Sequence, residues 1–200
     1  TAWSFLFLLV GPVYYHLSLI ALLVVWGFDR QRLLRTTIVV LIASIWAGIS
    51  RVNWFPMPAI LAATLYVLEE PVGAKPVWKY MLPILLWGLL GSLTAFGAQS
   101  LYAVISGNPA DQFASSFSSD LLWYRLLPNP TYPVGILISA AIVILPMLAV
   151  VYLQTKESTG RLHGLRWLTL GGMALVLFGG GLVVSVKIGG GSNLHNLDAL

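Results

Sequence analysis

The residues best suited to binding a ligand lie near the end of the chain, at positions 187–198. A lysine, three glycines, two asparagines, a histidine and an aspartate follow an apolar run long enough to cross a bilayer. The glycines allow close backbone approach and leave N–H donors, while the amides and the imidazole suit sugar hydroxyls. The residues predicted to contact the ligand are Lys187, Gly190, Asn193, His195 and Asn196.

A second polar pair, Arg51 and Asn53, lies between two short apolar runs, residues 33–50 and 55–68. At about 1.5 Å per helical residue, neither run comfortably crosses a hydrocarbon core of about 30 Å. The turn between them should therefore lie below the outer surface or line a cavity, because a charge survives at that depth only against protein or water. We predict a second binding site here. The alternative is an arginine at a helix end whose head reaches the interface.

The same residues exclude several other kinds of site. The Gly-Gly-Gly-Ser run at 189–192 lacks the ending of a phosphate-binding loop and follows no strand, and such a run is also typical of a flexible linker. His195 and Asp198 share a helix face but make too small a set for a metal, so no metal or cofactor is predicted. Three carboxylates, Asp111, Asp120 and Asp198, are predicted on the outer side, and one of them, Asp198 or Asp120 before Asp111, could act as a general base. Asp120 suits a helix N-cap better than catalysis.

The composition is that of an integral membrane protein. The 200 residues are 58% hydrophobic and 9% charged, with a mean hydropathy of +0.86. Soluble domains carry about 25% charge. The net charge of +4 is too small and too scattered to suggest a nucleic-acid partner. Without cysteine, disulfides and thiolate metal sites are excluded.

Hydropathy predicts an all-α fold, a polytopic transmembrane helix bundle of about six spans in a single domain covering residues 1–200. The second and third spans are short. The chain is expected to be a fragment of a longer protein. His16, inside the first span, is either a site residue or hydrogen-bonded to a neighbouring helix. Gly88, Gly91 and Gly97 predict close helix packing in the fourth. The expected spans are residues 2–28, 33–50, 55–68, 80–105, 134–153 and 167–186.

The distribution of Lys and Arg predicts which loops face the cytoplasm. Six alternating spans place eight cations on one side: Arg30, Arg32, Arg35, Lys75, Lys79, Lys156, Arg161 and Arg166. Only three fall on the other: Arg51, Arg125 and Lys187. Because cytoplasmic loops carry the excess of basic residues, the first set is expected on the cytoplasmic side of a bacterial inner membrane. The three lone cations would then meet at the outer face and hold a lipid phosphate.

Residues 50–58 and 187–198, with a Lys-x-Gly-Gly-x-x-Asn core at 187–193, resemble the later part of polytopic bacterial GT-C type glycosyltransferases. These are the dolichyl-phosphate-mannose and aminoarabinose-transferase-like membrane proteins. The resemblance implies a larger helix bundle that passes a sugar from a polyprenyl-phosphate donor to an acceptor at the outer face. By position, Lys187 matches the family motif. The weaker resemblance of residues 50–58 implies the same phosphate-binding role for Arg51. The family's catalytic aspartate lies in an early outer loop with no counterpart here.

Two further functions compete with the polyprenyl-phosphate-sugar-dependent transferase, so the sequence does not by itself assign an enzymatic activity. A non-catalytic accessory subunit of a larger membrane complex, with membrane lipid and other membrane subunits as partners, would need no catalytic acid. A transporter is disfavoured because the spans contain almost no charge of the kind that ion coupling uses.

Overall fold

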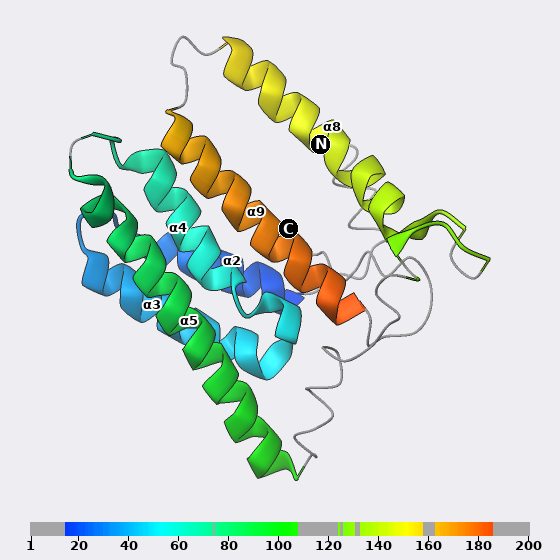
Figure 1. The fold of residues 1–200 in the computed structure, drawn as a ribbon. Coiled ribbons are helices and arrows are strands. Elements are labelled where there is room, and N and C mark those ends of the chain that lie inside the picture. The colour runs from blue at the N-terminus through cyan, green and yellow to red at the C-terminus, as the bar shows by residue number, and fades with distance from the viewer. Residues whose placement is uncertain are drawn as a thin grey trace. The chain divides into compact units, whose positions relative to one another are not determined.

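The computed structural model describes residues 15–73, 75–107, 124, 126–130, 133–157 and 163–185. Within these ranges the chain is helical and has no strand, which confirms the all-α class (Figure 1). The elements are α2 (Tyr15–Gly27), α3 (Leu33–Ser50), the 3-10 helix η1 (Val52–Trp54), α4 (Met57–Glu69), α5 (Val77–Ser106), α8 (Gly135–Glu157) and α9 (Gly164–Ser185).

Each of the six predicted apolar segments overlaps one of these helices, and α3 has the predicted bounds. Three are long and apolar enough to cross a membrane: Leu33–Ser50, Val77–Ser106 and Gly164–Leu182. The apolar stretches Tyr15–Gly27 and Gly135–Val150 are shorter. The helices are therefore compatible with a membrane protein, while a bundle of six spans stays a prediction.

The chain divides into two compact units. The first contains Thr1–Ala110 with Ala199, and the second contains Asp111–Asp198 with Leu200. Helices α2 to α5 belong to the first, which we call the four-helix unit. Helices α8 and α9 belong to the second.

In the second unit Gly135 begins α8 with φ of 72°, and a Cβ there would lie 2.7 Å from the carbonyl carbon of Leu127, so this position requires glycine.

Prolines and a glycine set the helix boundaries in the four-helix unit. Pro56 is the N-cap of α4 and Pro76 that of α5, positions where the missing N–H and the fixed φ of proline cost nothing. Helix α5 ends at Gly107, whose left-handed φ of 71° lets its N–H bond the last carbonyls. The short second and third spans of the sequence prediction are thus real helices of 18 and 13 residues.

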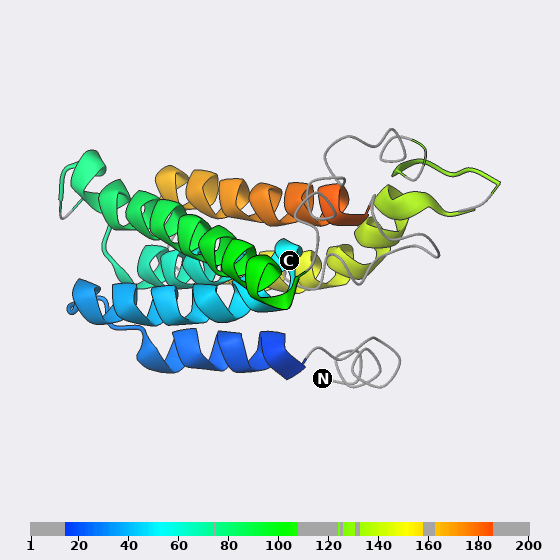
Figure 2. The ribbon, with the colours of Figure 1, turned by 90° about the horizontal axis from the view of Figure 1, so that it is seen from below.

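Helices α3 and α5 run in the same direction and approach closely. The Nε1–H of Trp87 donates to Thr37 Oγ1 at 2.9 Å. Further along both helices, a Cβ on Gly48 would come within 2.3 Å of the carbonyl oxygen of Ala95. Only a residue without a side chain permits this approach. Figure 2 shows α3 lying between α2 and α5.

Helices α2 and α4 run opposite to α3 and α5. At one end of α2, Trp46 donates from Nε1 to His16 Nδ1 at 3.2 Å; at the other end, Gly27 packs against Val39. This confirms that His16 is hydrogen-bonded to a neighbouring helix. On α4, Tyr66 meets Tyr80 of α5 with ring centroids 5.6 Å apart.

The glycine prediction for α5 is correct at one position. A Cβ on Gly91 would lie 3.1 Å from both the Ala59 Cβ and the Ser44 Oγ, so Gly91 packs where α3, α4 and α5 meet. Among the described atoms nothing lies within 4 Å of a Cβ on Gly88 or Gly97, so no described helix packs closely against these two glycines, and for them the prediction stays a prediction. A helix packed on one side leaves its other glycines outside the contact.

The outer face of α5 is a stripe of exposed leucines. Leu85, Leu89 and Leu93 recur at every fourth residue and are 63%, 59% and 59% exposed. The opposite face is also apolar, with Trp87 and Ala95 buried. A helix that is hydrophobic on all sides needs either a protein core or a membrane around it. The stripe is therefore compatible with a helix that faces a bilayer.

Candidate functional site: the turn between α3 and α4

The Arg51 turn reverses the chain within a few residues. Arg51 has an extended backbone, with φ of −154° and ψ of 140°, and its N–H still bonds the carbonyl of Ala47 at 3.0 Å. The next bonds are of the 3-10 type: Trp54 N–H to Arg51 O at 3.1 Å and Phe55 N–H to Val52 O at 3.2 Å. The turn therefore satisfies the backbone N–H groups of Arg51, Trp54 and Phe55 by itself.

The guanidinium of Arg51 is held at the turn by an indole ring. Its central carbon lies 5.8 Å from the centroid of the Trp54 ring, within cation–π range. Trp54 is 1% exposed and Asn53 is 5% exposed. The Nη1 atom of Arg51 is also buried. The Arg51 side chain is thus partly enclosed by protein. An arginine at a helix end whose head extends fully into solvent would not be enclosed in this way.

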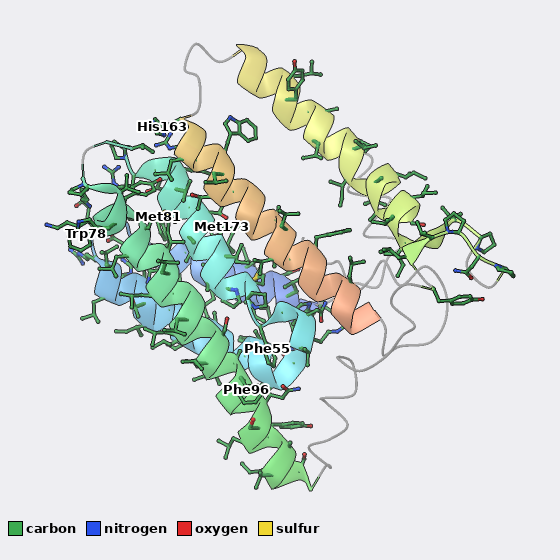
Figure 3. The ribbon with its side chains drawn as sticks, viewed as in Figure 1. Phe55, Trp78, Met81, Phe96, His163 and Met173 are labelled. Atoms are coloured by element: carbon green, nitrogen blue, oxygen red, sulfur yellow. The ribbon has the colours of Figure 1, made fainter. Side chains whose placement is uncertain are left out.

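Two more polar side chains belong to the same end of the four-helix unit. Gln99 lies one helical turn beyond Ala95, the residue that faces Gly48, and it is 8% exposed. His16 reaches this end through its bond to Trp46, one turn before Ser50. We call this end, with Arg51, Asn53, Gln99 and His16, the Arg51 end. Figure 3 shows Phe55 of the turn and Phe96 of α5 in this region.

The opposite end of the unit, the basic end, comprises residues 26–36, 69–73 and 75–79. Arg30 joins the two segments: its Nη1 donates to the Glu69 carbonyl at 2.7 Å. Arg35 donates from Nη2 to the Trp26 carbonyl at 3.4 Å. Both arginines thereby bind carbonyls at helix C-termini, where the helix dipole favours a cation. Lys75 forms an ion pair with Glu70, with Nζ and Oε1 2.7 Å apart.

Asp29 organises the start of α3 at the basic end. Its Oδ1 accepts bonds from the backbone N–H groups of Gln31 and Arg32, at 2.9 and 3.1 Å. Thr36 Oγ1 bonds both the N–H and the carbonyl of Asp29 at 2.9 Å. The bond from Gln31, followed by that from Arg32, lowers the pKa of the Asp29 carboxyl. On the other loop, the hydrogen bond that Lys75 donates to Glu70 raises the pKa of Lys75.

The charges of the described four-helix unit are divided unevenly between its ends. Its three carboxylates and all but one of its Lys and Arg side chains lie at the basic end, and Arg51 is the exception. The structure thus brings together two of the three loops that the sequence assigned to one side of the membrane. It does so through the bond between Arg30 and Glu69.

The remaining predicted site residues lie outside the described part of the chain. They are Asp120, Arg125, Lys187, Gly190, Asn193, His195, Asn196 and Asp198. Their convergence with Arg51 therefore stays a prediction. Within the described ranges no group of three His, Asp or Glu residues is placed to hold a metal.

Sequence reasoning located the Arg51 turn but missed its partner. Trp54 follows Arg51 by three residues, the spacing that a 3-10 turn brings onto one face. That spacing could have suggested the contact. No local signal relates Gln99 to the turn, because its placement depends on the register between α3 and α5.

No protein-family model, curated protein or solved structure matches the chain.

Proposed function

We propose that the chain is part of an integral membrane protein that transfers a sugar from a lipid-linked donor. The Arg51 end would face the outer side of a bacterial inner membrane and bind the donor phosphate. The observation that carries the proposal is a partly enclosed guanidinium, held 5.8 Å from the Trp54 ring at a turn between two short helices. Arginine binds phosphate oxygens through a two-pronged set of donors.

The charge distribution supports the orientation. Five cations at the basic end against Arg51 at the other, within the described four-helix unit, favour a cytoplasmic basic end. Along α3, Arg35 and Arg51 are 16 residues apart, so Arg51 lies about 24 Å from Arg35 along the helix axis. In a core of about 30 Å this depth suits the phosphate of a lipid in the outer leaflet.

The roles of the site residues follow from their chemistry. Arg51 would bind the phosphate, with Trp54 fixing the guanidinium plane and Asn53 offering an amide. Lys187, Gly190, Asn193, His195 and Asn196 would complete the site on the phosphate and the sugar, as the family resemblance implies. Proton transfer would fall to a carboxylate outside the described residues, with Asp120 and Asp198 as the candidates in this chain.

A second function, a non-catalytic accessory subunit, is favoured by one observation. Every described carboxylate of the four-helix unit, Asp29, Glu69 and Glu70, lies at the basic end. The described part of the Arg51 end could therefore bind an anion but offers no carboxylate as a general base. Such a subunit would hold lipid or stabilise a larger complex.

Binding of undecaprenyl phosphate to the full chain in nanodiscs tests the phosphate role, with undecaprenol as the matched ligand without phosphate. Charged hydrogen bonds contribute about 1.5–3 kcal/mol, so Arg51→Gln should weaken phosphate binding by about 10- to 100-fold and leave undecaprenol unchanged. Arg51→Lys should retain part of the affinity. A folded Arg51→Gln protein with unaltered affinity for undecaprenyl phosphate would contradict the proposal. Sugar transfer by the wild-type protein then separates the enzyme from the accessory subunit.

A further inference from the structure

The basic end contains two exposed cations that hold no helix terminus. Arg32 is the N-cap residue of α3, but its side chain makes no capping bond and is 77% exposed. Its Nε lies 3.9 Å from Asp29 Oδ2, at the limit of an ion pair. Lys79 stands 5.3 Å from the centroid of the Trp78 ring and, among the described residues, forms no ion pair. These two differ from Arg30 and Arg35, which bind backbone carbonyls.

Exposed indoles accompany these cations. Trp26, at the end of α2, is 81% exposed, and Trp78, at the start of α5, is 64% exposed. Figure 3 shows nitrogen-bearing side chains gathered around Trp78. The apolar side chains that follow along α3 and α5 are exposed as well, with Leu34 at 75% and Leu82 at 45%. Tryptophan beside Lys and Arg, above exposed leucines, is the side-chain order of a membrane interface.

We propose that the basic end is a binding surface for anionic phospholipid headgroups, with Arg32 and Lys79 as its headgroup contacts and Trp26 and Trp78 as its interfacial anchors. Charge complementarity selects the ligand, because cations outnumber carboxylates at this end five to three. An acidic protein would also satisfy the charges. It would leave the indoles and Leu34 without the apolar layer that lies below a headgroup. This surface is at the opposite end of the unit from Arg51 and does not depend on a transferase activity.

The probe is phosphatidylglycerol, compared with phosphatidylcholine, on the full chain in mixed micelles, with bound lipids counted by native mass spectrometry. The wild-type protein should retain phosphatidylglycerol in preference to phosphatidylcholine, and less so as salt is raised. A surface cation contributes about fivefold in affinity for an anionic bilayer. The double variant Arg32→Gln/Lys79→Gln should therefore lose the preference by about tenfold or more, with phosphatidylcholine retention unchanged.

The double variant Arg30→Gln/Arg35→Gln is the matched control, since it removes the same number of cations from the same end, at side chains that bind backbone carbonyls. When folded, it should keep the preference for phosphatidylglycerol. An Arg32→Gln/Lys79→Gln protein that retains the wild-type thermal midpoint in phosphatidylcholine and also retains the preference would overturn the proposal. Equal loss in a folded Arg30→Gln/Arg35→Gln protein would also overturn it, because the effect would then be one of net charge. Displacement of phosphatidylglycerol by a poly-glutamate peptide, with tighter binding of the peptide, would identify an acidic protein as the partner instead.

Discussion

The two ends of the four-helix unit use cations in different ways. At the basic end Arg30 and Arg35 bind helix-terminal carbonyls and Lys75 pairs with Glu70. At the Arg51 end one guanidinium lies over a buried indole, at a turn whose described surroundings in the unit include no carboxylate. The difference teaches that Arg30 and Arg35 at the first end connect helices. The cation at the second is positioned by packing, which is how a binding site is preorganised.

Close packing beneath the Arg51 end gives the largest predicted effect. Gly48→Ala would drive a Cβ to 2.3 Å from the Ala95 carbonyl oxygen, so α3 and α5 must separate. Overpacking of this kind costs about 1–3 kcal/mol. Gly88→Ala, on the open side of α5, should instead be neutral or stabilising by up to about 1 kcal/mol, because alanine restricts the unfolded chain. Thermal unfolding of the full chain in detergent measures both.

If Gly48→Ala unfolds at the same temperature as Gly88→Ala, the close approach of the two helices is not what positions the Arg51 end. A Gly48→Ala protein that is folded but less stable should also bind undecaprenyl phosphate more weakly, since the turn begins three residues later.

The Lys75–Glu70 pair at the basic end should give a smaller effect. Glu70→Gln removes the charge at constant size, and a partly exposed pair of this kind contributes up to about 1 kcal/mol. The hydrogen bond to Glu70 raises the pKa of Lys75 in the folded state. The ion pair therefore contributes its full stabilisation below the pKa of Lys75 in the unfolded chain, about 10.4. This stabilisation is lost as pH rises through the higher pKa of Lys75 in the folded state.

The measurement is the thermal midpoint between pH 9 and pH 11.5. The wild-type protein should lose more stability over this range than Glu70→Gln. Parallel curves for the two proteins would show that the Lys75–Glu70 ion pair does not stabilise the loop between α4 and α5.

Replacing Asp29 should have the smallest effect on the stability of the start of α3, and only at acidic pH. Its folded pKa is lowered by the bonds from Gln31 and Arg32, so its contribution is present above the unfolded pKa, about 3.9. That contribution disappears as pH falls through the folded value. Asp29→Asn keeps an acceptor oxygen at the start of α3 and does not titrate there. The protection factors for hydrogen exchange at the Gln31 and Arg32 amides, relative to the intrinsic rate at each pH, should fall below pH 4 in the wild-type protein, and Asp29→Asn should flatten that change. Identical pH profiles would contradict the role of the charge.

Much of the helical arrangement could be predicted, and the reason is local. The run 33–50 is apolar and is bounded by arginines, and the prolines at 56 and 58 must lie at a helix start, so α3 and α4 appear where expected. The depth of Arg51 was inferred from the same lengths. The enclosure of its guanidinium was not, because a hydropathy pattern carries no information on which ring a cation will meet.

The sequence by itself determined which segments are helical and apolar, where proline and glycine end them, and on which loops the cations concentrate. These properties depend on residues close in the chain. Only the tertiary structure decided that Gly91 packs and Gly88 does not, that His16 bonds Trp46, and that Arg30 joins its loop to α4. Each of these depends on the register between helices. A change of one residue in that register rotates a side chain by about 100° and so replaces its partners.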